Sequence, residues 1–102
     1  MARFDVYRNP ISDSDARYFV DIQSDLMSDL RTRVVIPLVP LPVFGTPVSR
    51  LNPVVAIEGQ LHALATTDMA GVHVTALGES VGSLESHADD ITNAVDFLLY
   101  GF

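Results

Sequence analysis

Residues 78–82, Gly-Glu-Ser-Val-Gly, have the Gly-x-Ser-x-Gly pattern of a nucleophile elbow, the tight turn that presents a catalytic serine in α/β-hydrolases. The segment also lies between a predicted strand and a predicted helix. The other triad members do not follow, because hydrolases of this class place the acid and then the histidine after the serine. Here the one later histidine, His87, precedes Asp89, Asp90 and Asp96. We therefore interpret the segment as a glycine-rich turn without catalytic function.

Histidines and paired carboxylates are the next candidates for chemistry. The three histidines, His62, His73 and His87, lack the spacing that places two ligands on one helix face, and the chain has no cysteine. We therefore predict no metal site and no cofactor. Loop solvation, turns at strand ends and the positive end of a helix dipole account for the close carboxylates without catalysis. These carboxylates are Asp13 with Asp15, Asp21 with Asp25, and Asp89 with Asp90. We predict no catalytic residues.

Residues 100–102, Tyr-Gly-Phe, are the strongest candidate for a functional surface. An apolar helical pattern runs directly into them, and the glycine allows the backbone to bend so that Phe102 is presented beyond the helix. Aromatic residues at this position need either a place inside the fold or a partner outside it. Two interpretations stay open. The aromatic residues contact a partner, or Leu98, Leu99 and Phe102 complete the monomer core or a dimer interface.

The elements that position these residues are mainly short strands. Alternation and β-branched residues predict strands at residues 3–8, 17–24, 32–39 and 72–77, and a hairpin formed by residues 54–57 and 61–65. Glu58-Gly59 forms the hairpin turn, since glycine supplies the positive φ that such turns need. Residues 37–53 carry five of the six prolines. Because proline lacks a backbone donor, we predict a connection there with one short helical turn.

One helix is predicted after the glycine-rich turn. Apolar residues recur at steps of three and four and so share one face of a helix about four turns long: Leu84, Ala88, Ile91, Val95 and Leu98. Glu85, Asp89 and Asp90 lie in its first two turns, where the helix dipole favours negative charge. Ser83 or Ser86 is predicted to cap the helix.

Length and charge limit the classes of function. The 102 residues contain no linker or repeat, which predicts one domain over residues 1–102. No apolar run approaches the roughly 20 residues of a membrane span, so we predict a soluble protein without membrane association. A net charge of −7, with six arginines and no lysine, disfavours direct nucleic-acid binding. The absence of cysteine and of a secretory signal predicts a cytoplasmic location. The small size makes a homodimer a reasonable expectation.

Eight short segments occur in an order that is specific to one family. They are residues 19–25 (FVDIQSD), 33–38 (RVVIPL), 48–50 (VSR), 53–55 (PVV), 66–70 (TTDMA), 77–79 (LGE), and 90–91 (DI) with 93–94 (NA). With them the chain resembles the CcdB toxin family over essentially its whole length. The resemblance implies an α+β, mostly β fold, similar to that of MazF-type ribonuclease toxins. This SH3-like barrel has an antiparallel five-stranded sheet, a smaller sheet and a C-terminal helix.

The resemblance also implies a function and a set of partners. CcdB-like toxins of bacterial type II toxin–antitoxin systems act as homodimers that bind the DNA gyrase A subunit and trap gyrase on cleaved DNA. They inhibit gyrase without catalysing a reaction. A CcdA-like antitoxin neutralises the toxin and binds operator DNA, so the toxin reaches the operator only through the antitoxin, as a transcription corepressor.

The gyrase contacts that the resemblance implies lie at the helix end and on the loop after the second strand. They correspond to Leu26, Met27, Asp96, Leu99, Tyr100, Gly101 and Phe102. The familiar Trp-Gly-Ile ending is Tyr-Gly-Phe here, and Asp96 stands where an asparagine is familiar. Two alternatives remain: a toxin of the same fold that cleaves RNA, and a regulator that binds the antitoxin but no longer poisons gyrase.

Overall fold

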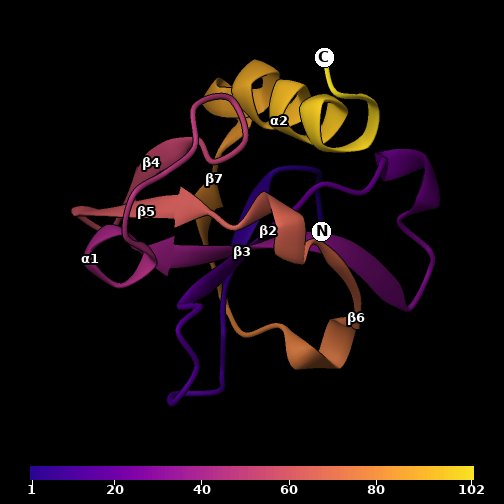
Figure 1. The fold of residues 1–102 in the computed structure, drawn as a ribbon. Coiled ribbons are helices and arrows are strands. Elements are labelled where there is room, and N and C mark those ends of the chain that lie inside the picture. Colours follow the sequence, from indigo (N-terminus) through magenta and orange to yellow (C-terminus); the bar gives the residue numbers. More distant parts are fainter.

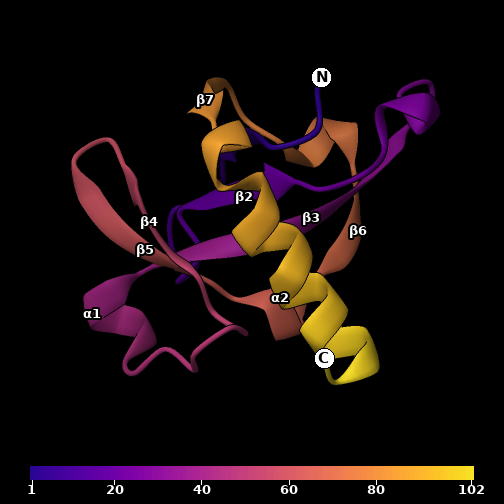
Figure 2. The same ribbon diagram turned by 90° about the horizontal axis from the view of Figure 1, so that it is seen from above.

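The computed structural model describes residues 1–102. Seven strands form one curled antiparallel sheet, and the long helix α2 lies across it (Figures 1 and 2). The strands are β1 (Asp5–Arg8), β2 (Tyr18–Asp21), β3 (Thr32–Pro40), β4 (Val54–Ile57), β5 (Gln60–Leu64), β6 (Ala70–His73) and β7 (Ser80–Ser83). The helices are α1 (Leu41–Phe44) and α2 (Ala88–Tyr100), with 3₁₀ helices η1 (Asp25–Met27), η2 (Thr66–Asp68), η3 (Val74–Ala76) and η4 (Glu85–His87).

The nine-residue strand β3 organises the sheet. The strand order is β4-β5-β3-β2-β1-β7, and β6 pairs with β3 outside this order. Leu38 pairs with Leu64 of β5, whereas Val35 pairs with Ala70 of β6, so the two ends of β3 have different neighbours on the same side. The predicted fold class, a mostly antiparallel β protein with a C-terminal helix, is confirmed. The smaller sheet that we expected is joined to the larger one through β3.

The prediction for the proline-rich segment is wrong at its beginning and correct for its helical turn. Pro37 and Pro40 belong to β3, where Pro37 lies opposite Phe19. Pro37 lacks a donor, but its carbonyl accepts a hydrogen bond from the Ala65 amide at 2.9 Å. Proline is tolerated at a position whose N–H is not needed for the ladder. The expected short helical turn is α1, which begins directly after β3.

Two further boundaries differ from the sequence predictions. The strand predicted at 72–77 ends at His73, because the imidazole Nδ1 accepts a hydrogen bond from the Thr75 amide at 3.2 Å and starts η3. Residues 80–83, which we expected in a glycine-rich turn, form strand β7 and pair with β1. Local capping and tertiary pairing therefore outweigh the intrinsic preferences of these segments.

The predicted hairpin and helix are both present. Glu58 and Gly59 have φ values of 51° and 80°, as a two-residue turn with positive φ at both central positions requires. Helix α2 buries Ile91 of the predicted apolar face and also Ala94, which the prediction did not include. The predicted cap is wrong, because Ser83 accepts from the Glu85 amide and so starts η4, whereas α2 has no side-chain cap.

The hydrophobic core lies between the sheet and α2. It is built from apolar residues of five strands and helix α2, with Phe4 just before β1 and Leu84 between β7 and η4: Phe4, Val6, Tyr18, Val20, Ile36, Leu38, Val55, Ile57, Leu64, Leu84 and Ile91. None of the helices combines the length and the apolar character that crossing a membrane requires. The core thus fixes α2 through its first three turns and leaves its last turn near the surface.

Gly78 is required by a close approach of two backbone segments. A Cβ atom at this position would lie 2.7 Å from the Arg8 carbonyl oxygen, which already accepts a hydrogen bond from the Gly78 amide at 2.8 Å. We expect Gly78→Ala to lower the free energy of unfolding by about 1 to 3 kcal/mol, as overpacking does. Urea unfolding measures this. Gly71→Ala, where a Cβ meets no atom within 4 Å, is the matched control, and equal losses would contradict the explanation.

Candidate functional site

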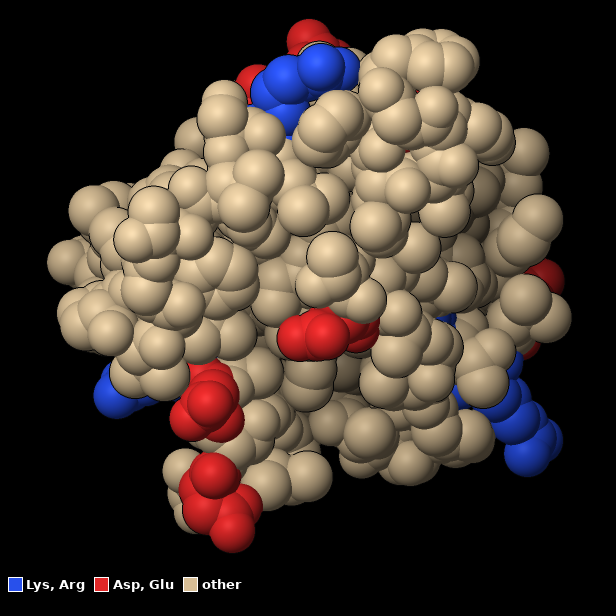
Figure 3. All heavy atoms as spheres, viewed as in Figure 1, with Lys and Arg blue, Asp and Glu red and all other residues tan.

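The end of α2 presents a cluster of exposed apolar side chains. Leu99, Tyr100 and Phe102 are 56%, 66% and 79% exposed. The Tyr100 and Phe102 rings lie 6.3 Å apart, centroid to centroid, at a tilt of 35°. The surface over this end of α2 is mostly uncharged (Figure 3). Leu99 and Phe102 therefore do not complete the core of this chain, and Leu98 is only half-buried.

Gly101 fixes the direction in which the chain leaves the helix. Its φ of 79° lies in the left-handed region, and its amide donates to the Phe97 carbonyl at 2.9 Å. This is the helix C-cap that glycine forms without a steric penalty. The turn brings Phe102 back beside Tyr100, so the two rings form one surface. Asp96 lies one turn earlier in α2 and is half-buried.

A second exposed apolar group lies on η1. Leu26 is 95% exposed, and Met27 and Leu30 are also exposed. The backbone beneath them is fixed, since the Ser24 hydroxyl accepts from the Leu26 amide at 3.2 Å and the Gln23 amide group donates to the Met27 carbonyl at 2.9 Å. Apolar side chains held in water on an ordered turn are typical of a contact surface.

The structure does not join these two groups into one surface within a single chain. They lie next to each other in the view of Figure 1, but the view from above separates η1, which lies beyond β6, from the end of α2 (Figure 2). The C-terminal group of expected contacts, Asp96 and residues 99–102, is together at one end of α2. Leu26 and Met27 are elsewhere on the molecule.

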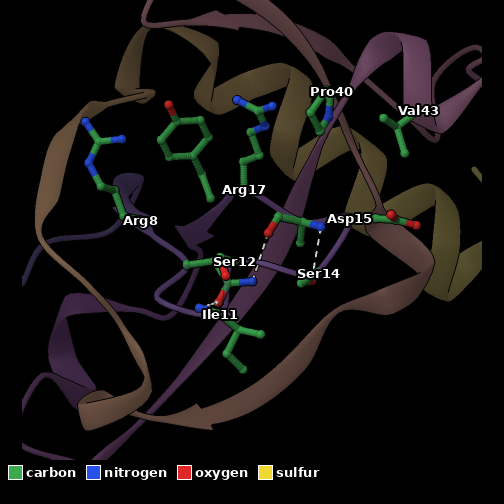
Figure 4. Close-up of a pocket in the computed structure, with 11 residues that line it drawn as sticks. Arg8, Ile11, Ser12, Ser14, Asp15, Arg17, Pro40 and Val43 are labelled. Carbon is green, nitrogen blue, oxygen red and sulfur yellow. Dashed lines mark hydrogen bonds between the residues drawn. The ribbon is translucent and has the colours of Figure 1, made fainter.

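A polar cluster that connects β1 and β2 to the β4–β5 turn is the other candidate site. Arg8 contacts Glu58 and Glu79, each at 2.7 Å, and the Tyr18 hydroxyl donates to Glu58. The His62 ring packs edge-on against Tyr18 at 5.1 Å. Beside this cluster is a hollow of about 340 Å³ whose lining includes Arg8, Arg17, Tyr18, Asp15, Ile11 and Val43 (Figure 4).

The electrostatics of this cluster do not favour acid–base chemistry on a phosphodiester. Tyr18 and Arg8 each donate a hydrogen bond to a different oxygen of Glu58. These bonds lower the pKa of Glu58, which makes it a weak base. Burial, followed by the bond to Glu58, raises the pKa of Tyr18. Arg8 is already paired with two carboxylates. The cluster therefore holds the β4–β5 turn and the residue before β7 against β1, and Arg8 is not free to bind a phosphate. Arg17, which lines the same hollow, makes no salt bridge.

His62 predicts a pH dependence of stability. It is buried, its Nδ1 lies 2.9 Å from the Gln60 carbonyl oxygen, its Nε2 has no partner, and burial lowers its pKa. Below a pH of about 6.5 the unfolded chain binds a proton that the folded chain does not, so stability falls with falling pH. Urea unfolding at about pH 7.5 and about pH 5.5 should show a larger decrease for the natural protein than for His62→Phe. Equal decreases would show that His62 does not contribute.

The remaining sequence candidates have structural roles. Ser80 lies in strand β7, so residues 78–82 do not form a nucleophile elbow. Asp21 does not act with Asp25. Asp21 is fully buried and pairs with Arg33 at 2.6 Å, whereas Asp25 accepts from the Arg3 amide at 2.8 Å. No three His, Asp or Glu side chains are grouped so that they could hold a metal ion.

Sequence reasoning did not identify the buried Asp21–Arg33 pair or the contact between Arg50 and Phe97 on α2. The Arg50 guanidinium carbon lies 4.5 Å from the Phe97 ring centroid. Neither pair has a spacing that sequence alone would reveal, because each joins elements that only the fold brings together.

The chain matches one protein family and is similar to solved structures. The family model described as CcdB protein matches residues 3–101. Among solved structures, the chain is similar to an endoribonuclease in complex with its cognate antitoxin from a mycobacterial species, with a TM-score of 0.76, 12% identity, and coverage of 97% of this chain and 94% of that chain. It is also similar to an endoribonuclease from a mycobacterial species, with a TM-score of 0.77, 13% identity, and coverage of 97% and 90%. At these identities the structures show a shared fold.

Proposed function

The chain belongs to the CcdB family, and on this basis we propose that it is the toxin of a bacterial type II toxin–antitoxin system. The toxin acts in the cytoplasm, where it binds the DNA gyrase A subunit and traps gyrase on cleaved DNA. It catalyses no reaction of its own. Residues 1–102 act as one toxin domain.

The exposed aromatic end of α2 is the observation that carries this proposal. Tyr100 and Phe102 are held in one arrangement by the left-handed cap at Gly101 rather than left on a frayed chain. Large aromatic side chains with few rotatable bonds are enriched among the residues that dominate binding energy. The face of Tyr100 can stack on an arginine guanidinium of gyrase. Asp96 and Leu99 contact the same partner from the last two turns.

We propose that the working unit is a homodimer. Leu26 and Met27 lie apart from the end of α2 within one chain (Figure 2). A second copy related by two-fold symmetry can place η1 of one subunit and α2 of the other toward one partner. Gyrase A is itself dimeric, so a two-fold symmetric toxin can engage both subunits at once.

The second proposed partner is a CcdA-like antitoxin that neutralises the toxin. One of the similar structures is a complex of an endoribonuclease with its cognate antitoxin. The net charge of −7 opposes direct contact with a DNA backbone. In this proposal the antitoxin binds operator DNA. The toxin acts as a corepressor by binding the antitoxin and does not contact the DNA.

RNA cleavage is the second candidate function, because both similar structures are endoribonucleases. Such an enzyme needs a cationic groove and a base near the scissile phosphate. Arg8, which lines one hollow, is saturated by Glu58 and Glu79. Arg17 lines the same hollow and Arg50 lines the other, and neither makes a salt bridge. The CcdB family match and the net charge of −7 favour the gyrase-directed function over RNA cleavage.

Titration calorimetry of the purified protein against the breakage-reunion fragment of gyrase A, together with an assay on labelled RNA, separates these functions. We expect saturable binding to the fragment and intact RNA. Leu99→Ser should weaken binding, whereas Leu61→Ser, which truncates a leucine of similar exposure on β5, should not. Cleaved RNA without gyrase binding would favour the ribonuclease, and antitoxin binding alone would favour the non-poisoning regulator.

A further inference from the structure

The loop between α1 and β4 is fixed to the sheet by side chains that lie beneath it. The buried Asn52 accepts from the Val48 amide at 3.0 Å and donates to the Leu64 carbonyl at 2.9 Å. The Thr66 hydroxyl donates to the Leu51 carbonyl. These bonds close residues 48–52 into a turn and connect it to β5 and η2. The backbone of this turn therefore cannot relax independently of the sheet.

Arg50 has a strained backbone within this fixed turn. Its φ of 70° lies in the left-handed region, which residues with a Cβ rarely adopt. Such strain persists only where the surrounding structure determines it, and it concentrates at functional positions. The left-handed backbone directs the Arg50 side chain toward α2. The guanidinium carbon lies 4.5 Å from the centroid of the Phe97 ring. Arg50 makes no salt bridge.

Phe97 lies beyond the last fully buried residue of α2, in a helix that also packs Val95 against the core and contacts η2. The buried residues of α2 are Ile91 and Ala94, and no residue after Ala94 is fully buried. A hollow of about 460 Å³, lined by Arg50, Pro53, Val54, Asp90 and Asn93, separates the loop from the first half of the helix. The loop therefore contacts the last turns of the helix through Arg50 and the Phe97 ring.

Phe97 also connects Arg50 to the aromatic end. Its carbonyl accepts the hydrogen bond from the Gly101 amide at 2.9 Å, which is the C-cap that turns Phe102 toward Tyr100. Direct contacts therefore connect the fixed turn to the Gly101 cap, through the Arg50 guanidinium and then Phe97. A movement of Phe97 changes the geometry of the cap directly.

We infer that Arg50 is a positioning residue, whose guanidinium on the Phe97 ring holds the last turn of α2 so that Tyr100 and Phe102 keep one arrangement. Its consequence for gyrase rests on the proposed function, but the contact itself is a property of this chain. A cation over an aromatic face is attracted by the negative face of the ring, and the attraction is weakened but not removed by solvent exposure.

Hydrogen exchange of the Gly101 amide, followed by NMR, tests the contact without gyrase. Arg50→Gln should speed this exchange about two- to five-fold, as expected for loss of a partly exposed cation–π pair. The Ile36 amide in the core should be unaffected. Phe97→Leu should have the same effect, and Arg50→Gln should add nothing in that background. Arg50→Lys should retain most of the protection, and Arg17→Gln, which removes the same charge elsewhere, should change nothing.

Arg50→Gly distinguishes positioning from a general contribution to stability. Glycine accepts the left-handed backbone without strain, so this variant should match or exceed the natural protein in urea unfolding. It should nevertheless show the faster Gly101 exchange of Arg50→Gln. Unchanged exchange in both variants would overturn the inference.

The affinity for the gyrase A fragment completes the test. We expect Arg50→Gln to weaken binding by about the same factor of two to five. Faster exchange with unchanged affinity would overturn the role in binding. If the natural protein does not bind gyrase at all while exchange responds as expected, the proposed function fails and the structural contact stands.

Discussion

Deletion of residues 100–102 is expected to abolish toxicity and to leave the fold intact. Tyr100 and Phe102 are the most exposed aromatic side chains, and neither belongs to the core. Truncating one strong interface anchor costs about 2.7 kcal/mol, which is about a hundred-fold in affinity, and the deletion removes two such anchors. Induced expression in sensitive cells should therefore stop growth with the full chain and not with residues 1–99.

The control for this prediction is the folded state of the shortened chain. Its urea midpoint should lie close to that of the full chain, because the deletion removes no buried side chain and only the Gly101 cap of α2. Leu61→Ser, which changes exposed apolar surface on β5, should remain toxic. Growth arrest by the folded 1–99 chain would show that the end of α2 is not the working surface.

Breaking the buried Asp21–Arg33 pair is expected to have the largest effect on stability. Both side chains are fully buried, and Asp21 Oδ2 contacts Arg33 Nε at 2.7 Å and Nη2 at 2.6 Å. Asp21→Asn leaves the guanidinium without its counter-charge, which costs about 3 to 5 kcal/mol in comparable buried pairs. Tyr7 cannot replace that charge, since burial, followed by nearby carboxylates, raises its pKa to about 12.

A double substitution separates the cost of an orphaned charge from the value of the pair. In Asp21→Leu with Arg33→Met, both charges are removed and apolar groups fill part of the volume, so the loss should be much smaller than for Asp21→Asn alone. Urea unfolding of the natural protein and the two variants provides the comparison. A double variant as unstable as the single one would show that packing, rather than the unpaired charge, controls stability here.

Local patterns in the sequence were sufficient for the elements that local physics determines. The β4–β5 turn needs positive φ at Glu58 and Gly59, and a glycine in that context indicates the hairpin. Helix α2 follows from apolar spacing alone, because the apolar residues at steps of three and four, among them the buried Ile91, share one face that must be covered. Strand β3 was predicted over residues 32–39, but the connection was wrongly predicted to begin at Pro37. Whether a proline needs its absent donor depends on which neighbour lies beside it.

Part of the candidate site could likewise be predicted from local sequence features, and part depends on the fold. Residues 100–102 could be identified because their apolar character and the glycine are local features. The separation of Leu26 from the end of α2 depends on how the sheet curls, which no pattern within either segment encodes (Figure 2). The Arg50–Phe97 contact was equally inaccessible, because it depends on a left-handed φ at a residue that rarely adopts it.

We propose that this protein traps gyrase on cleaved DNA through the end of α2. The most direct measurement incubates supercoiled plasmid with the cognate gyrase and ATP, adds the full chain or residues 1–99, and quantifies linear DNA after detergent and protease. We predict linear DNA with the full chain and none above background with residues 1–99. No linear DNA with either chain, or equal amounts with both, would contradict the claim.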